Sequence, residues 1–298
     1  MLDMEELGIG HTPLVELPPV HGNRMFLKLE GENYLGSAKA RTAYYILKHL
    51  PPEAEGKTLV ESTSGNLGYA LGILAREMGR DFLALVDESI APRKLRRLQE
   101  AKIRYRCIKS EDGEDARMAR ILEAQRLMER GPYYWVRQYD NPAGVLAHEE
   151  TTGPELWQQC GGALTHCVVA CGTCGTICGL GRFLKRVSPG VQICAVEPLG
   201  STIFGKSSGP YLNAGAGLAE KPGNLLREPG LVDRDFQIPD AKAIACAREL
   251  YHHFGLSVGI TGGMAYAAAL EIAEREEGAS IAVLVADGRE WYPQQLKA

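Results

Sequence analysis

A lysine in the first turn of a predicted helix is the first residue of this chain that could carry out chemistry. Lys39 follows Gly36 and Ser37 and opens a segment of good helix formers that continues to Pro51. The positive end of a helix dipole disfavours the charged form of an amine, which makes the amine a better nucleophile toward carbonyl groups. Because most first-turn lysines are solvated surface residues, this interpretation needs support from the rest of the chain.

Three loops of small residues each follow a predicted strand and precede a predicted helix. They are Thr63-Ser64-Gly65-Asn66, Gly172-Thr173-Cys174-Gly175-Thr176 and Thr261-Gly262-Gly263. Backbone N–H groups at the start of a helix attract phosphate or carboxylate, and the binding crevices of parallel sheets lie at these strand ends. The loops, taken together with Lys39, predict a binding site for an anionic group.

Other interpretations of the second loop fit its residues less well. Its glycines lack the G-x-G-x-x-G spacing of a dinucleotide site, and it does not end in the Gly-Lys-Ser/Thr of a P-loop. Four cysteines nearby are spaced like iron–sulfur ligands: Cys167, Cys171, Cys174 and Cys178. The first lies on a predicted strand and the last lies inside a predicted helix, so the four would not converge on one cluster. We therefore predict no metal and favour a phosphate site.

Predicted strands and helices alternate along the chain and would position these loops. Strands are predicted at residues 25–29, 58–61, 82–86, 103–108, 133–136, 164–170, 191–197, 256–260 and 281–285. Helices are predicted at 38–50, 66–78, 92–101, 112–129, 176–187, 240–254 and 263–276, with a helical segment after 142 that breaks at Gly153 and Pro154. This alternation predicts an α/β protein with mainly parallel sheets flanked by helices. Segment 198–229 is too long for a simple connection, which predicts a functional loop.

The composition limits the class of protein. The 298 residues carry a formal net charge of −4 with an isoelectric point near 6.0, which argues against a nucleic-acid or anionic-membrane partner. We interpret the basic run from Arg93 to Arg106 as a solvated face. The N-terminus lacks the apolar stretch of a signal peptide, and no segment reaches the length of a membrane span. We expect a cytoplasmic protein whose eight cysteines stay reduced.

Further motifs follow one another along the chain in a recognisable order. They are Thr12-Pro13-Leu14-Val15, Gly36 to Arg41, Thr63 to Asn66, Gln138, Asn141-Pro142, Thr151 to Trp157, Gly172 to Thr176, Val196-Glu197-Pro198, Gly215-Ala216-Gly217, Pro222 to Leu225 and Gly259 to Gly263. This ordered set resembles the fold-type-II pyridoxal-phosphate enzymes of the cysteine synthase and cystathionine β-synthase family. The resemblance implies a two-lobed fold like that of the tryptophan synthase β subunit. It places a smaller mobile lobe at 35–140 and a larger phosphate-binding lobe at 1–34 and 141–298.

The resemblance also implies a role for each matching residue. Lys39 would form a Schiff base with pyridoxal 5'-phosphate and later move the α-proton of the substrate. Asn66 would bind the 3-oxygen of the cofactor, and Thr261 would face its pyridine nitrogen. Its phosphate would lie against Gly172, Thr173, Cys174, Gly175 and Thr176. The substrate carboxylate would be held by Thr63, Ser64, Gly65 and Gln138.

An uncharged hydroxyl at Thr261 would not keep the pyridine nitrogen protonated, so loss of a β-substituent is favoured over transamination. The resemblance implies β-replacement on an O-activated L-serine, either O-acetylserine or O-phosphoserine, through an aminoacrylate intermediate. The acceptor would be sulfide, another thiol or an amine, and closure of the smaller lobe would exclude water. The partners are then a small amino acid and a small nucleophile, and the family implies a homodimer. The alternatives are β-elimination of the serine or threonine dehydratase type and a non-catalytic binding subunit on the same fold.

Several residues near the predicted site depart from the family pattern. Tyr34-Leu35 replaces the usual Pro-Ser/Thr before the lysine loop, and Ala40 follows the lysine where Asp or Cys is common. Leu67 replaces a threonine of the carboxylate loop, and Cys174 replaces a glycine of the phosphate loop. We expect Leu67 to remove a donor to the substrate carboxylate and Tyr34 to add bulk near Lys39. Both changes indicate a specialised donor or acceptor.

Overall fold

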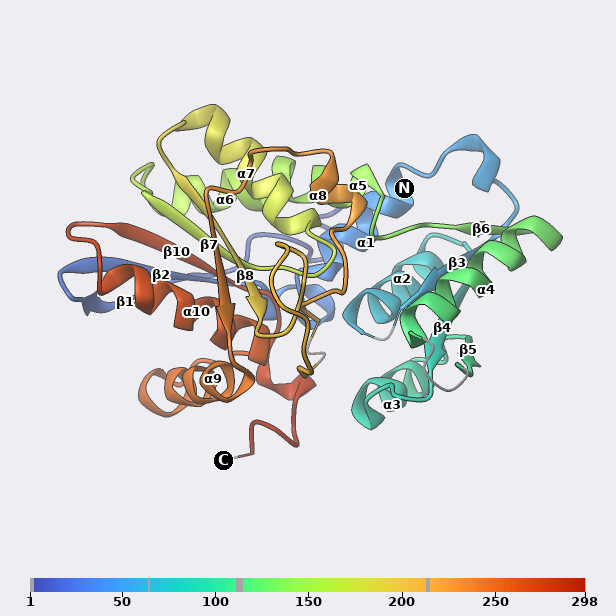
Figure 1. Cartoon of the computed structure of the whole chain (residues 1–298). Coiled ribbons are helices and arrows are strands. Elements are labelled where there is room, and N and C mark those ends of the chain that lie inside the picture. Colours follow the sequence, from blue (N-terminus) through green and yellow to red (C-terminus); the bar gives the residue numbers. More distant parts are fainter. Residues whose placement is uncertain (1–2, 64, 111–114, 213–214, 298) are drawn as a thin grey trace.

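The computed structural model describes residues 3–63, 65–110, 115–212 and 215–297. Two β-sheets lie side by side, each with helices on both faces (Figure 1). The predicted α/β class with mainly parallel strands is confirmed, since β1 and β2 form the only antiparallel pair among the strand pairs of the described ranges. None of the helices in these ranges combines the length and apolar composition that a bilayer span requires.

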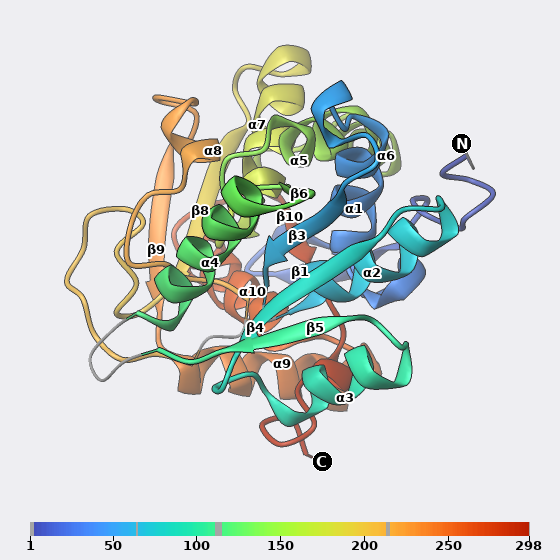
Figure 2. The ribbon, with the colours of Figure 1, turned by 90° about the vertical axis from the view of Figure 1, so that its right-hand side faces the viewer.

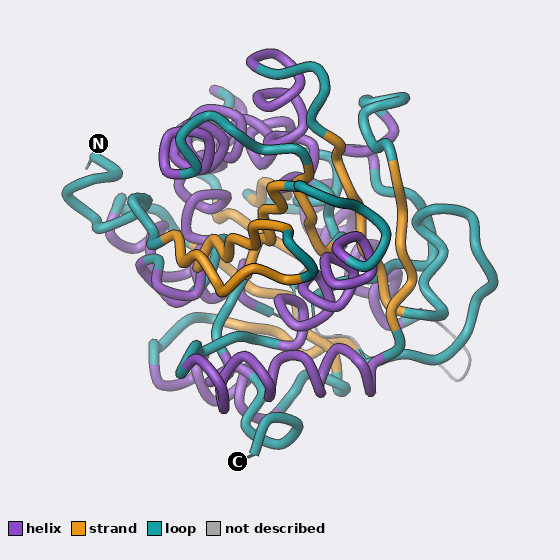
Figure 3. The backbone as a smooth tube through the Cα atoms, turned by 90° about the vertical axis from the view of Figure 1, so that its left-hand side faces the viewer, coloured by secondary structure: helices purple, strands orange, loops and turns teal. Residues whose placement is uncertain are grey.

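The larger sheet has six strands in the order β1-β2-β10-β7-β8-β9. Its strands are β1 (Leu14–Val20), β2 (Asn23–Leu29), β10 (Ser280–Val285), β7 (His166–Ala170), β8 (Gln192–Pro198) and β9 (Arg234–Ile238). Helices α9 (Asp240–Phe254) and α10 (Ile260–Ala273) lie on one face, and α6 (Gly153–Gln159) and α7 (Gly175–Val187) lie on the other (Figures 1 and 3). All six residues of β10 are buried, as expected for a parallel strand that is covered on both faces.

The smaller sheet has four parallel strands in the order β5-β4-β3-β6. Its strands are β5 (Tyr105–Ile108), β4 (Phe82–Asp87), β3 (Thr58–Ser62) and β6 (Tyr133–Trp135). Helix α4 (Ala116–Arg130) covers one face, while α1 (Lys39–Lys48), α2 (Asn66–Glu77) and α3 (Pro92–Glu100) lie on the other side (Figure 2). Successive strand residues point to opposite faces, so Leu59 packs with the α1–α2 side and Val60 packs with α4.

One predicted strand is wrong, and the two edge strands of the larger sheet, β1 and β9, were not among the predicted strands. Residues 256–259 form no strand, because Gly255 ends α9 with a φ of 68° and α10 already begins at Ile260. The short apolar run that suggested a strand belongs to the approach to this buried helix, and such runs do not distinguish strand from helix. The predicted break at Gly153 is a change of helix type, because a π-helical turn (His148–Thr152) joins α5 (Pro142–Ala147) to α6.

A buried network of charges fixes the start of α1 against the larger sheet. Arg41 donates through Nε to Glu30 at 2.8 Å and through Nη1 to Glu155 at 2.6 Å. Lys28 on β2 also donates to Glu155, at 2.9 Å. Burial alone would raise the pKa of Glu155, but the hydrogen bonds and charges of Arg41 and Lys28 lower it to about 2. The helix that carries Lys39 is therefore held within its first turn, two residues after Lys39, by paired charges.

Candidate active site

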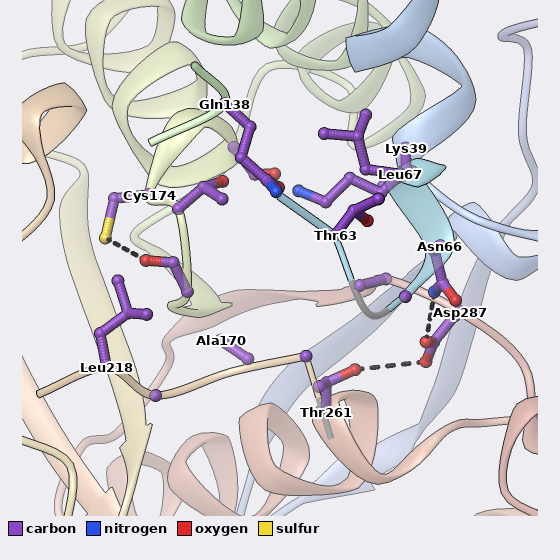
Figure 4. A pocket seen from close by; sticks show the side chains of 18 of the residues that line it. Lys39, Thr63, Asn66, Leu67, Gln138, Ala170, Cys174, Leu218, Thr261 and Asp287 are labelled. Carbon is purple, nitrogen blue, oxygen red and sulfur yellow. Dashed lines mark hydrogen bonds between the residues drawn. The ribbon is translucent and has the colours of Figure 1, made fainter. Parts of the chain in front are cut away.

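The loops predicted to carry the chemistry meet at one pocket, which is lined from both sheets (Figure 4). Strands β3, β7 and β10 point their carboxyl ends toward it, as expected for open parallel sheets. The predicted site residues that line this pocket are Lys39, Thr63, Gly65, Asn66, Gln138, Gly172, Thr173, Cys174, Thr176 and Thr261. Of the two others, Gly175 is buried and is not among the lining residues, and Ser64 falls outside the described residues.

Lys39 is the first residue of α1, and its amine lies in the pocket. The turn before it is anchored by a backbone hydrogen bond of 2.9 Å from Ala38 N–H to the carbonyl of Ala286, just beyond β10. Burial lowers the pKa of the Lys39 amine, and the neighbouring Cys174 and Asp287 act in the opposite direction. Burial thus adds to the effect of the helix dipole that the sequence suggested, and both favour a neutral, nucleophilic amine.

The loop after β3 brings Asn66 and Thr63 to the pocket. Asn66 donates through Nδ2 to Asp287 at 2.7 Å, while its own Oδ1 is buried and has no hydrogen-bond partner among the described residues. The Thr63 hydroxyl oxygen accepts from the backbone N–H of Gly68 at 3.0 Å, which secures the first turn of α2. A buried acceptor without a partner is costly, so Asn66 is suited to receive a ligand group at this point.

The second loop joins β7 to α7 and needs glycine at two close backbone contacts. A side chain at Gly172 would place its Cβ 2.7 Å from the carbonyl oxygen of Gly215, and one at Gly175 would lie 3.0 Å from that of Gly144. Cys174 has a φ of 60°, a left-handed conformation that favours glycine. The loop therefore forms a concave backbone surface at the positive end of α7, which suits a phosphate group.

Thr261 contacts a carboxylate that the sequence analysis did not single out. Its hydroxyl lies 3.3 Å from Oδ1 of Asp287, whose Oδ2 accepts from Tyr292 at 2.8 Å in addition to Asn66. Burial raises the pKa of Asp287 to about 6, although these hydrogen bonds act to lower it. The available signal was its place directly beyond β10, at the carboxyl end of a central parallel strand. The hydroxyl predicted to face the cofactor is thus linked to an acid.

Three basic side chains also line the pocket and were not predicted: Lys94, Arg117 and Arg120. Arg120 is buried, and its Nη1 lies 2.6 Å from Oδ2 of Asp87. Arg117 is paired with Glu220 at 2.8 Å, which links α4 to the long segment before α8 (Gly223–Leu226). Burial lowers the pKa of the Lys94 amine, and the charge of Asp287 acts in the opposite direction. The pocket is therefore lined by three basic side chains in addition to Lys39, and two of them are paired with carboxylates.

The interpretation of the basic run 93–106 as a solvated face is wrong in part. Lys94 points to the pocket, and the guanidinium of Arg97 lies 3.8 Å from the centre of the Trp291 ring. The pattern of charges marked one side of α3 as polar, but the pocket and an aromatic ring occupy part of that side.

Leu67 and Tyr34, two of the residues that depart from the family pattern, lie in different parts of the structure. Leu67 is buried and lines the pocket, so an apolar side chain replaces a hydroxyl there. Tyr34 is not among the described residues that line the pocket, and its hydroxyl donates to Glu77 at the far end of α2. The expectation that Tyr34 adds bulk near Lys39 is therefore not supported. Among the described residues, no group of three or more His, Cys, Asp or Glu side chains could hold a metal ion.

A model of the family described as "Pyridoxal-phosphate dependent enzyme" matches residues 5–288. The chain belongs to this family. Cysteine synthase B of Escherichia coli (strain K12) is 33% identical, and the match covers 96% of this chain and 93% of that protein. The solved cysteine synthase of Entamoeba histolytica superposes with a TM-score of 0.88 at 29% identity, over 97% of this chain and 89% of that one. An O-ureido-L-serine synthase superposes with a TM-score of 0.87 at 30% identity, over 96% and 92%.

These comparisons confirm the predicted resemblance, the fold class and pyridoxal phosphate as the cofactor of this enzyme. The residues present fit such a group on independent grounds. An amine of lowered pKa, a buried amide oxygen without a partner and a glycine surface at a helix start all face the same pocket. The residues that would hold the cofactor are Lys39, Asn66, Thr261 and the loop Gly172–Thr176.

Proposed function

We propose that this enzyme catalyses β-replacement on an O-activated L-serine, exchanging the leaving group for a thiol, sulfide or amine. The observation that carries the proposal is the convergence of Lys39 and the three predicted loops on one pocket. The similarity to cysteine synthases over nearly the whole chain supports the same reaction class. The buried loops and the lowered pKa of Lys39 argue against a subunit that only binds.

Each residue has a proposed task in this reaction. Bound pyridoxal phosphate supplies an electron sink that acidifies the α-hydrogen of an amino acid. Lys39 would hold the cofactor through Nζ and, when neutral, accept the α-proton at the same atom. Thr63, Ser64, Gly65 and Gln138 would hold the substrate carboxylate, while Asn66 and Thr261 orient the cofactor. Leu67 would exclude water from the face of the site where relatives of this pattern carry a hydroxyl.

The basic lining of the pocket favours O-phosphoserine over O-acetylserine as the donor. A phosphate ester carries two negative charges near neutral pH, whereas an acetyl ester carries none. Lys94, Arg117 and Arg120 line the pocket from the smaller sheet, and the buried Nε of Arg120 has no hydrogen-bond partner among the described residues. An unsatisfied guanidinium nitrogen is suited to bind a phosphate oxygen.

A second cavity supports an acceptor larger than sulfide. It has a volume of about 440 Å³ and shares Arg117, Tyr139 and Leu218 with the first pocket, so the two lie next to each other. It lies between α4 and the segment before α8, which places it beside the route by which an acceptor could approach. An organic thiol or an amine would use such a space, whereas sulfide would not need it.

The residues 35–140 are proposed to form a smaller mobile lobe that closes over a larger lobe made of 1–34 and 141–298. The four-stranded sheet lies within residues 35–140. The same range contains Gln138, Lys94, Arg117 and Arg120, which line one pocket together with the phosphate loop. By family likeness we also propose a homodimer located in the cytoplasm. Light scattering on the purified protein tests the oligomeric state.

Product analysis with purified holoenzyme tests the reaction. O-phospho-L-serine and O-acetyl-L-serine are each incubated with no acceptor, with sulfide, with organic thiols and with amines. We expect the phosphate ester to be consumed faster, and only when an acceptor is present. Release of pyruvate and ammonia without an acceptor would favour β-elimination instead. No turnover by protein that retains the cofactor absorbance would favour a binding subunit, and Lys39→Ala serves as the inactive control.

A further inference from the structure

A carboxylate lies buried beneath Gln138, outside the pocket itself. Glu61 on β3 is 0% exposed, and both of its oxygens are used by one residue. Its Oε2 accepts from the backbone N–H of Gln138 at 3.2 Å, and its Oε1 accepts from the side-chain Nε2 of Gln138 at 3.3 Å. Glu61 therefore holds both the backbone and the side chain of a residue that lines the active site.

The side-chain nitrogen of Gln138 is fully engaged. Besides Glu61, it donates to the carbonyl of Ser62 at 2.7 Å. A primary amide nitrogen has two hydrogens, so both are used by these acceptors. The remaining side-chain atom, Oε1, is itself an acceptor and would repel a carboxylate. In this arrangement Gln138 cannot donate its amide to the substrate unless it gives up one of its two bonds.

We propose that Glu61 is a positioning residue that competes with the substrate carboxylate for the side-chain amide of Gln138. The proposal rests on the function of Gln138 given above. The bond to Glu61 is the longer of the two, so it is the one that the amide releases when substrate binds. A charged acceptor holds an amide more strongly than a neutral one, so release is easier when Glu61 is protonated. Donor affinity then depends on the protonation of a residue that never touches the donor.

The surroundings of Glu61 place this competition in the working pH range. Burial raises the pKa of Glu61 to about 7, and hydrogen bonds from Gln138 oppose this increase. The groups that face it from β6 and from its own strand, Trp135 and Ser62, are uncharged. Tyr139 is a titratable side chain that interacts with Glu61, and its pKa is raised by burial and also by Glu61. Donor affinity should therefore fall as the pH rises through about 7.

Other charged groups near this region act on the same site and must be separated from Glu61. Arg117 and Arg120 on α4 lower the pKa of Tyr139, and Arg120 is paired with Asp87 at the end of β4. Asp287, which lines the pocket, has a pKa of about 6. Because Glu61→Gln leaves all of these groups in place, the difference between wild type and this variant isolates the contribution of Glu61.

Calorimetric titration of holoenzyme with L-alanine tests the proposal without turnover. Alanine carries the α-carboxylate and amine but has no leaving group. We expect the dissociation constant of the wild type to rise about fivefold more between about pH 6 and pH 8 than that of Glu61→Gln. Parallel curves for the two proteins would overturn the proposal. Melting temperature and cofactor absorbance show whether the variant is folded and loaded.

A second variant decides the matter if Glu61→Gln does not fold. Gln138→Ala has no amide for which the two carboxylates could compete, so its curve should also lack the extra rise above about pH 7. A wild-type slope in Gln138→Ala would overturn the competition. If Gln138→Ala binds alanine as tightly as wild type at every pH, the carboxylate role of Gln138 fails. If wild type binds no amino acid at all, the proposed function fails.

Discussion

Two sets of carboxylates in this enzyme, each wholly or mostly buried, differ in their partners. Glu30 and Glu155 lie beside Arg41, with Lys28 also bound to Glu155, and the pKa of each is lowered despite burial. Glu61 and Asp287 have hydrogen-bond donors but no ion pair among the described residues, and burial raises their pKa to about 7 and about 6. Burial alone does not decide whether a carboxyl group is ionised. A paired guanidinium does.

The two sets also differ in where they lie: Glu30 and Glu155 support α1, whereas Glu61 and Asp287 contact residues that line the pocket. The paired set lies between α1 and the larger sheet, where fixed charges hold the helix that carries Lys39. The second set lies against Gln138, Asn66 and Thr261, which line the pocket. Carboxyl groups that titrate near neutral pH occur preferentially at functional sites, and this molecule follows that tendency.

Removing Arg41, the cation shared by Glu30 and Glu155, should have the largest effect on stability. Arg41→Met leaves the buried Glu30 without a cation and leaves Glu155 with Lys28 alone, and we expect a loss of about 3 to 5 kcal/mol in the free energy of unfolding. Urea denaturation of the holoenzyme measures it. Arg24→Met, which breaks an exposed pair with Glu16, is the matched control and should change stability little. Equal losses in both variants would contradict the comparison.

Acid should destabilise the enzyme through the same set of carboxylates, Glu30 and Glu155. The pKa of Glu155 is about 2, below its ordinary value of 4.5, so the native state binds fewer protons than the unfolded state between these values. The stability contributed by Glu155 is present above pH 4.5 and is lost as the pH falls toward about 2. Melting temperatures recorded across this range should decline steeply in wild type. The decline should be shallower in Arg41→Met, because the pair that lowers the pKa is gone.

For the second set, Glu61 and Asp287, stability should change with pH in the opposite direction. The pKa of Glu61 is raised from 4.5 to about 7, so the native state binds more protons and its stability falls as the pH rises between these values. Glu61→Gln removes the charge that wild type carries above this range. The free energy of unfolding of the variant minus that of wild type should therefore be about 1 kcal/mol larger above this range than at low pH. Denaturation at two pH values measures this change. A variant destabilised equally at both would show that the charge does not matter.

The smallest effect should appear at Lys39. The negative charge of Asp287 raises the pKa of this amine, against the larger effect of burial. Asp287→Asn should therefore shift the pH dependence of cofactor attachment to lower pH, by less than about one unit. The measurement is the rate at which apoenzyme gains cofactor absorbance as a function of pH. An unchanged profile would show that Asp287 does not act on the lysine.

Much of the fold could be predicted because its signals are local. Strand β3, helix α2 and the loop between them follow from an apolar run, small residues and a helix start within twenty residues of sequence. The strand predicted at 256–260 failed because an apolar run beside a glycine-rich turn suits a buried helix equally well. The edge strand β9 was missed because only pairing with β8 distinguishes it from the irregular segment before it.

The candidate site could be predicted only in part. Lys39, Asn66 and Thr261 each stand at a helix start that the sequence itself marks. Asp287 and Glu61 follow or lie in strands without such a mark, and Lys94, Arg117 and Arg120 resemble ordinary surface charges on amphipathic helices. Their orientation toward the pocket depends on how the two sheets pack.

By itself, the sequence determined which groups could do chemistry and in what order they occur, because turn residues, helix starts and apolar runs act over short stretches. Only the tertiary structure decided which buried carboxylate meets a cation. Glu155 is separated from Arg41 by 114 positions, and Asp287 from Asn66 by 221. Ionisation depends on distances through space, and only folding brings groups so far apart along the chain into contact.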